Sequence, residues 1–215
     1  MRIVWRFALV AALLAAGCGE DEQTATRVPA APSLRPAPAA VARACQQATG
    51  RVAFPVVCPS RWPPHGGAGQ PKLRSFGRTA DAYLLDASNG FSRRKTHVFH
   101  LLLGGQRRPF GRWPSGVDSD LRVTTHKVVI PERGGGTFVQ HLPARRIATA
   151  RVHGALATVL REPPYPTGGI HGDHVLVLWN EGGHGYLVSV HGERLASPAL
   201  VSVALAMARS ARGVR

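Results

Sequence analysis

The 215-residue sequence has few lysines, few acidic residues and no familiar catalytic motif. Only three of its 27 basic residues are lysines, so arginine carries nearly all of the positive charge, against 12 acidic residues and a formal charge of +15. Neither GxSxG nor HExxH occurs, which removes the usual signs of a serine hydrolase or a zinc protease. We therefore predict that the protein is not an enzyme and uses no cofactor.

Long apolar runs are also missing, apart from one near the N-terminus. Residues 7–16 are apolar, follow Arg2 and Arg6, and lead through small residues to Cys18. A membrane-spanning helix needs about 20 apolar residues, whereas a basic start, a short apolar run and a small-residue end are typical of a secretory signal peptide. We expect residues 1–17 to be that signal, and the mature chain to lie outside the cytoplasm.

The stretch Ala15–Cys18, AAGC, resembles the lipobox of bacterial lipoproteins. In that family the signal is cut before the cysteine, whose sulfur then carries diacylglycerol, with acyl chains such as palmitate. The resemblance implies a lipid anchor on Cys18 at the extracytoplasmic face of the cell membrane, held by about 0.8 kcal/mol per buried methylene. The alternative is an ordinary secretory signal followed by an unrelated cysteine.

Residues 18–43 combine an acidic start, Glu20 to Glu22, with alanine and proline. Such a segment buries too little apolar surface to fold alone, and proline keeps it extended. We predict a disordered tether here, followed by a single domain over residues 44–215.

The remaining cysteines, Cys45 and Cys58, are an even number in an exported chain and are predicted to form a disulfide bond. Closing so short a loop typically stabilises a domain by about 3 kcal/mol in the chain-entropy model. A metal site at this pair would need more ligands nearby, and in the sequence only His65 is close.

The rest of the chain has the two-residue period of β-strands, broken by glycine-rich turns. Strands are predicted at Lys72–Arg78, Ala80–Ala87, Thr96–Leu103, Leu121–Ile130, Thr137–Leu142, Arg145–Val152, Ala155–Arg161, His174–Asn180 and Gly185–Val190. Residues 52–57 should be an edge strand because of Pro55. A short helix should end at Gly50, and an amphipathic helix should begin at Ser197, a good N-cap. The predicted fold is α+β, an antiparallel twisted meander with the C-terminal helix packed on one face and a short N-terminal helix.

Three motifs and the last helix follow one another between residues 150 and 210. The motifs are Gly154–Ala157, His174–Gly183 and Tyr186–Ser189. This succession resembles the ending of some uncharacterised bacterial extracytoplasmic domains, including those attached to certain anti-sigma factors and related lipoproteins. The resemblance implies a curved sheet with helices on one side and a sensing or ligand-holding role, and it supplies no catalytic residues.

Histidines provide an alternative, a metal site. Its candidate ligands are His171, His174, His184 and His191. If residues 181–184 close a hairpin, His174 lies opposite His191 with Cβ atoms about 5 Å apart, within reach of a shared ion. Against this, histidine is common at solvated strand ends. Ser189 should share a face with His191, but no orienting acid is near in sequence, which argues against a nucleophile.

Two loops that pair arginine with aromatic residues are the predicted binding surface. Their members are Arg61, Trp62, Arg107, Arg108, Phe110, Arg112 and Trp113. Guanidinium groups and aromatic rings together suit an anionic or sugar-like polymer, through charge and stacking. The alternative is that the tryptophans are buried anchors and the arginines only solvate the loops.

The function that fits these patterns is that of a membrane-anchored extracytoplasmic lipoprotein, a non-enzymatic binding or sensing module. Loss of Arg2 and Arg6 with the signal would lower the formal charge from +15 to +13. Export argues against nucleic acid as the partner, and anionic lipid head groups or cell-wall polymer are expected instead. A GC-rich genome would also give an arginine-rich chain. Two alternatives remain, a carrier of a hydrophobic ligand and a metal-dependent enzyme.

Overall fold

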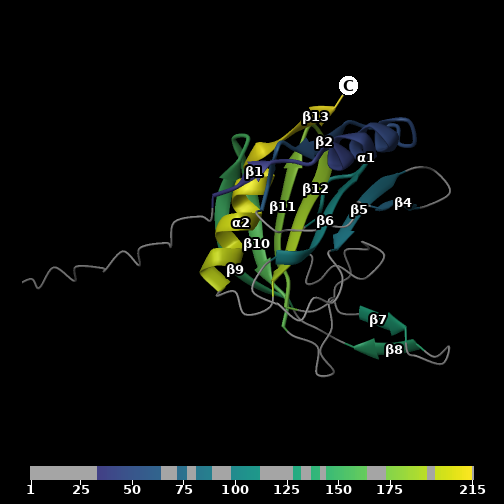
Figure 1. The fold of residues 1–215 in the computed structure, drawn as a ribbon. Helices are drawn as coiled ribbons and strands as arrows, with labels where there is room; N and C mark the ends of the chain where they lie inside the picture. The colour runs from purple at the N-terminus through teal and green to yellow at the C-terminus, as the bar shows by residue number, and fades with distance from the viewer. Residues whose placement is uncertain are drawn as a thin grey trace, which may run out of the picture.

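A computed structural model describes residues 33–63, 72–76, 81–88, 98–111, 128–131, 137–140, 144–163, 173–192 and 197–214. These residues form mostly antiparallel sheet with two helices (Figure 1), so the predicted α+β class is confirmed. The predicted signal and Cys18 lie outside the described residues.

Seven strands form the main sheet, and each pairs antiparallel with its neighbours. In chain order they are β4 (Lys72–Phe76), β5 (Ala82–Ser88), β6 (Val98–Gln106), β9 (Arg145–Val152), β10 (Ala155–Arg161), β11 (Val175–Glu181) and β12 (His184–Gly192). Across the sheet the order is β4-β5-β6-β12-β11-β10-β9. The sheet therefore consists of two meanders joined where β6 pairs with β12, and the prediction of one continuous meander is wrong at that point.

The junction arises because the chain leaves the sheet after β6. The next two strands, β7 (Val128–Pro131) and β8 (Thr137–Gln140), pair only with each other among the described residues. The chain re-enters the main sheet at β9, on its edge, and winds back until β12 reaches β6. β11 and β12 are thus central, and their valines, leucines and aromatic residues suit strands buried on both faces.

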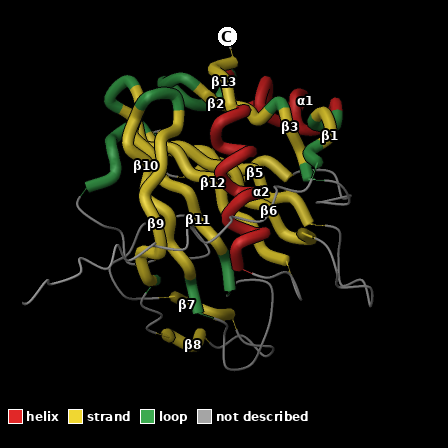
Figure 2. The backbone as a smooth tube through the Cα atoms, turned by 90° about the vertical axis from the view of Figure 1, so that its left-hand side faces the viewer, coloured by secondary structure: helices red, strands yellow, loops and turns green. Residues whose placement is uncertain are grey.

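Two helices pack on one face of the main sheet. They are α1 (Ala39–Thr49) and α2 (Ser197–Ser210). α1 stops before Gly50 and α2 starts at Ser197, as predicted. Leu200 and Met207 of α2 are buried in the same core as Val177 of β11, and Figure 2 shows α2 running across the strands. Within the described ranges, neither helix has the length and apolar character needed to cross a membrane.

The folded part begins before the predicted boundary at residue 44. β1 (Arg35–Pro36) pairs with β3 (Arg61–Trp62), and α1 already starts at Ala39. The alanines at the start of α1 favour helix, and Val41 is buried against the sheet. Residues 35–43 therefore belong to the folded unit and not to the predicted tether.

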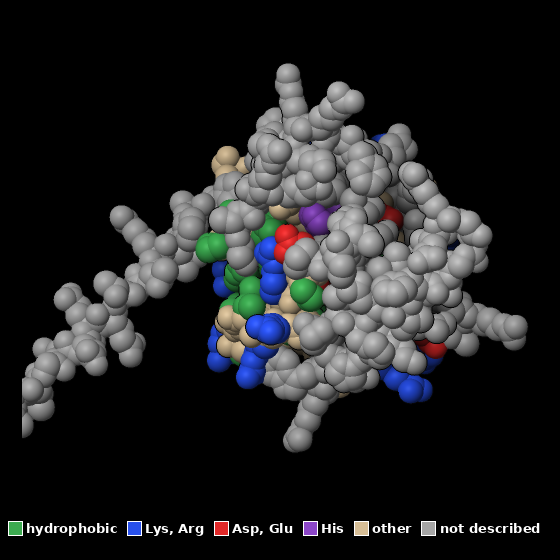
Figure 3. Space-filling view, turned by 90° about the horizontal axis from the view of Figure 1, so that it is seen from below, with side chains coloured by type: hydrophobic (Ala, Val, Ile, Leu, Met, Phe, Trp, Pro, Cys, Tyr) green, Lys and Arg blue, Asp and Glu red, His purple; other side chains and the backbone are tan. Residues whose placement is uncertain are grey.

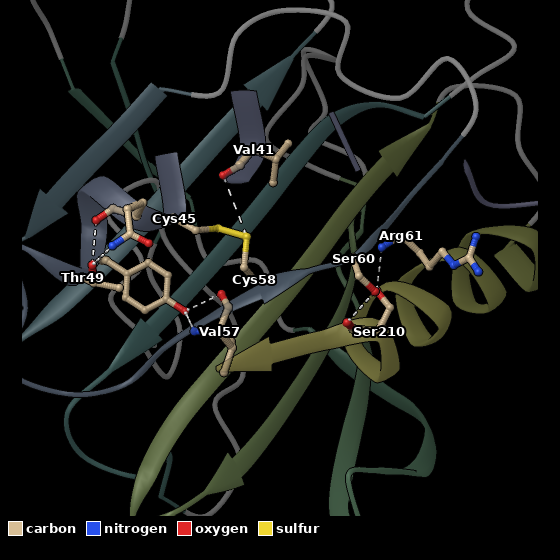
Figure 4. The surroundings of a disulfide bond; sticks show 10 residues. Val41, Cys45, Thr49, Val57, Cys58, Ser60, Arg61 and Ser210 are labelled. Carbon is tan, nitrogen blue, oxygen red and sulfur yellow. Dashed lines mark hydrogen bonds between the residues drawn. A yellow bond between two sulfur atoms is a disulfide. The ribbon is translucent and has the colours of Figure 1, made fainter. Parts of the chain in front are cut away.

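A disulfide bond joins Cys45 of α1 to Cys58 of β2 (Val56–Pro59), with Cα atoms 6.0 Å apart (Figure 4). The predicted pairing is confirmed. β2 pairs in turn with β13 (Ala211–Val214), the last strand of the chain. The bond therefore ties α1 to a two-stranded sheet that contains both early and late residues.

Candidate functional site

The candidate site lies on the face of the main sheet that α2 does not cover. Side chains alternate along a strand, so β12 directs Val188 and Val190 to the helix-side core and Leu187 and Ser189 to the opposite face. We call that opposite face the second face. It carries a leucine cluster near the β11–β12 turn and polar side chains near the other ends of these strands.

A short loop after β6, residues 107–111, folds over the second face; we call it the arginine loop. The side chain of Asn180 clamps it, because Phe110 N–H donates to Asn180 Oδ1 at 2.8 Å and Asn180 Nδ2 donates to the Phe110 carbonyl at 3.1 Å. The Phe110 ring packs against the leucine cluster that includes Leu187. Backbone bonds and apolar contact together fix the position of the loop.

Two further hydrogen bonds hold the base of the arginine loop. Gly185 N–H donates to the Arg108 carbonyl at 3.1 Å, and His184 Nδ1–H donates to the Arg107 carbonyl at 2.8 Å. A Cβ at Gly185 would lie 3.0 Å from the Phe110 ring and 3.1 Å from the Arg108 oxygen. The close approach of the loop to β12 therefore depends on glycine at this position.

The side chains of Arg107 and Arg108 remain exposed on this fixed backbone. Arg107 approaches Asp81 with an N–O distance of 3.7 Å, but the two side chains are 62% and 52% exposed. Exposed pairs of this kind contribute between about 0 and 1 kcal/mol. Asp81 thus holds the Arg107 guanidinium only weakly, and the guanidinium can bind another anion instead.

The other residues of the predicted binding surface do not form the surface that the sequence predicted. Trp62 is only 3% exposed and belongs to the core, so its predicted role as a stacking platform is wrong. Arg61 is exposed, but it lies on β3, where its backbone N–H donates to Ser210 Oγ at the end of α2. Arg112 and Trp113 lie outside the described residues. Of the predicted binding residues, only those of the arginine loop are therefore described on the second face.

The structure also separates some of the histidines that were predicted to form one metal site. The β11–β12 turn has the expected register, which places His174 opposite His191, with ring centroids 5.0 Å apart. His184, however, lies at the other end of β12, against Phe54 and the arginine loop. His171 is outside the described residues, and among those that are described no three side chains form a metal-binding group.

His174, just before β11, instead belongs to a chain of polar side chains that also includes residues of three strands. Its Nδ1 lies 2.6 Å from Ser189 Oγ on β12, and its Nε2 lies 3.3 Å from His100 Nδ1 on β6. The chain ends at Asp86 on β5, whose Oδ1 is 3.2 Å from His100 Nε2. We call these four side chains the histidine relay. Figure 3, the view from below, shows a histidine side chain next to acidic and basic side chains.

Sequence reasoning missed His100 and Asp86, although it considered Ser189 and rejected it for want of an acid. The acid arrives through the pairing of β6 with β12, between residues that no local pattern connects. His100 and His174 are 74 positions apart. The available signal was a histidine and an aspartate at inward-facing positions of two apolar strands.

The alternative function as a carrier of a hydrophobic ligand would need an apolar cavity, for example between the sheet and the helices. A cavity there is lined by Val41, Trp62 and Met207 on one side and by Leu85 and Leu101 on the other. Its volume is about 10 Å³, close to the minimum that holds one water molecule. This cavity has no room for a hydrophobic ligand.

A second polar network closes the end of the sheet near the β11–β12 turn. His153 Nδ1–H donates to Glu181 at 2.8 Å, and the Trp179 indole N–H donates to the same oxygen at 3.1 Å. Burial raises the pKa of Glu181, but these hydrogen bonds and the charges of His153 and Arg212 outweigh it and hold that pKa below 4.5. Burial, with the Glu181 charge, raises the pKa of Tyr186 to about 12.

No protein-family model matches the chain, and neither the curated proteins nor the solved structures give a significant match. Function is therefore inferred from the geometry of the arginine loop and of the histidine relay.

Proposed function

We propose that the protein is a lipid-anchored, extracytoplasmic, non-enzymatic binding module that holds an anionic lipid head group or wall polymer on its arginine loop. The observation that carries the proposal is the clamp: Asn180 and Gly185 fix the loop backbone by hydrogen bonds while Arg107 and Arg108 stay exposed. The anchor is Cys18, on the resemblance of residues 15–18 to a lipobox.

A fixed loop favours binding because less conformational entropy is lost when the ligand arrives. Guanidinium groups present a planar fork of donors that matches phosphate and carboxylate oxygens. Two such groups on adjacent residues suit a ligand with closely spaced anionic groups, as on a head group or a repeating polymer. The aromatic ring of Phe110 acts differently from the prediction, because it anchors the loop from beneath.

The net charge supports the same partner. A mature chain with a formal charge of +13 is attracted to an anionic surface, and each basic residue close to a lipid surface contributes about 1 kcal/mol. A lipid at Cys18 would keep the domain within reach of such a surface. The arginine loop would then select which anionic group is held.

The test compares two pairs of arginines in the purified protein carrying Cys18→Ala, so that no lipid anchors it. We expect Arg107→Gln with Arg108→Gln to reduce co-sedimentation with anionic vesicles or with purified wall polymer, and to flatten its salt dependence. The control is Arg43→Gln with Arg51→Gln, which removes the same charge from exposed positions in and after α1. Equal pelleting of the two double variants from 0.1 M to 1 M salt, where the Debye length falls from about 10 Å to 3 Å, would overturn the proposal.

Two further variants separate the position of the loop from its charge. Asn180→Ala removes both side-chain bonds to Phe110, and Gly185→Ala introduces a Cβ that the loop must avoid. Both keep every arginine, so we expect weaker binding with an unchanged salt dependence. Binding as strong as that of the unaltered protein would show that charge alone, without the fixed loop, accounts for the affinity.

A further inference from the structure

We propose that the histidine relay of Asp86, His100, His174 and Ser189 is a proton-binding site that takes up a single proton as one unit. The proposal is independent of the arginine loop. It rests on three consecutive hydrogen-bond contacts of 3.2, 3.3 and 2.6 Å that link β5, β6, β12 and the residue just before β11 on the second face.

The carboxylate fixes the direction of every hydrogen bond in the relay. Ionised Asp86 can only accept, so His100 must carry its proton on Nε2. His100 Nδ1 is then an acceptor, and His174 must donate to it from Nε2. His174 Nδ1 accepts in turn from the Ser189 hydroxyl. With two neutral histidines the chain therefore has one arrangement, in which all donors point from Ser189 toward Asp86.

One added proton fits without moving a heavy atom. If it is placed on His174 Nδ1, the Ser189 hydroxyl rotates and accepts from it. From that state the Nε2 proton of His174 can pass to His100 Nδ1, whose N–H then donates to His174 Nε2, while the added proton stays on His174 Nδ1, toward Ser189. The proton is shared between the two rings, and Asp86 balances its charge at one end.

A second proton does not fit. With both rings charged, an N–H on His100 Nδ1 and an N–H on His174 Nε2 would face each other across 3.3 Å. Two donors and two like charges at that separation repel. The second uptake therefore separates the rings and loosens the ends of β6 and β11, which is the structural consequence that a sensor of acidity requires.

Burial indicates why the ligand is a proton. Ser189 is 1% exposed, and His100 and His174 are 2% exposed each, so their atoms are closed to a water-sized body. Asp86, at 21% exposed, is the end through which a proton can enter. Among the described residues, the neighbouring ionisable groups include His191, ring to ring with His174, and buried Glu162, whose backbone N–H donates to the His174 carbonyl. The Arg161–Asp173 ion pair also lies next to His174.

The direct test is an NMR titration of the full chain labelled with ¹⁵N in histidine. Above the transition, both His100 and His174 should show the Nε2–H tautomer. On acidification the two rings should shift with one common midpoint and take up one proton between them, because interacting sites titrate as a pair. His153 and His184, on the far ends of the strands, serve as internal controls. An Nδ1–H tautomer at either relay ring, or two separate midpoints, would overturn the proposal.

Two conservative variants extend the test. Asp86→Asn removes the balancing charge, so the shared midpoint should move to lower pH for both rings. Ser189→Ala removes the contact at the opposite end, and the resonance of His100 should still respond because the chain transmits the change. If His100 is unaffected by Ser189→Ala while His174 shifts, the rings are independent and the unit does not exist. If a variant fails to fold, the tautomers and titration midpoints of the unaltered protein alone decide whether the relay takes up a proton as one unit.

Discussion

The hydroxyl of Tyr83 occupies both hydrogen-bonding groups of Val57. Val57 N–H donates to the Tyr83 oxygen at 3.1 Å, and the hydroxyl donates to the Val57 carbonyl at 3.2 Å. Tyr83 lies on β5 and Val57 on β2, beside Cys58. Burial strongly raises the pKa of Tyr83, so the hydroxyl stays protonated and both bonds persist at any physiological pH.

Tyr83→Phe should therefore destabilise the fold. It leaves a buried N–H and a buried carbonyl without this partner, which costs about 1–3 kcal/mol. The measurement is the free energy of unfolding in urea. Tyr186→Phe is the matched control, because it removes a single bond, at 3.0 Å, to the carbonyl of exposed Pro55. A larger loss in Tyr186→Phe than in Tyr83→Phe would contradict this account.

Removing the disulfide should also cost stability. Changing Cys45 and Cys58 together to alanine should lower the free energy of unfolding by about 2–5 kcal/mol, the usual range for small secreted domains. Mass mapping without reductant should recover the two cysteines in one linked pair of peptides. Finding both thiols free in the mature protein would refute the bond.

Acid should weaken the network around Glu181. Its pKa is held below 4.5 in the folded protein, so its contribution to stability is complete above about pH 4.5 and is lost as the pH falls through the folded value. Because the carboxylate is largely exposed, the contribution should stay under about 1 kcal/mol. Glu181→Gln should flatten the fall in Tm between pH 5 and pH 3. An unchanged slope would assign the acid sensitivity to other carboxylates.

Cys18→Ala should release the protein from membranes. The substitution removes the sulfur that the lipobox resemblance designates for acylation, and with it the anchor. Fractionation followed by a high-salt wash is the measurement, since the wash removes purely electrostatic attachment. A variant that remains with the membrane after the wash would show that another part of the chain anchors it.

Local patterns predicted the elements well where a strand and its neighbour share a turn. β9 and β10 have the predicted bounds, and the turn that joins them contains Gly154, whose φ of +84° favours glycine. The opposition of His174 and His191 followed in the same way from the turn at Gly182 and Gly183.

Other features depend on contacts that no local pattern contains. The relay requires β6 beside β12, which decides that Asp86 and His100 meet His174. Trp62 looked like a surface ring because it stands between arginine and proline, but β3 places it in the core. Nothing in a short window distinguishes an anchoring tryptophan from a stacking one.

The pairing of β6 with β12 also sets the order in which the protein can fold. Each meander pairs strands that are neighbours in sequence and can therefore form quickly. The pairing of β6 with β12 requires a long loop to close, and pairings of this kind form slowly. His100 comes from one half and His174 from the other. Their hydrogen bond can form only after the two halves dock. The imidazole resonances of His100 and His174 would therefore report when the sheet is completed during refolding.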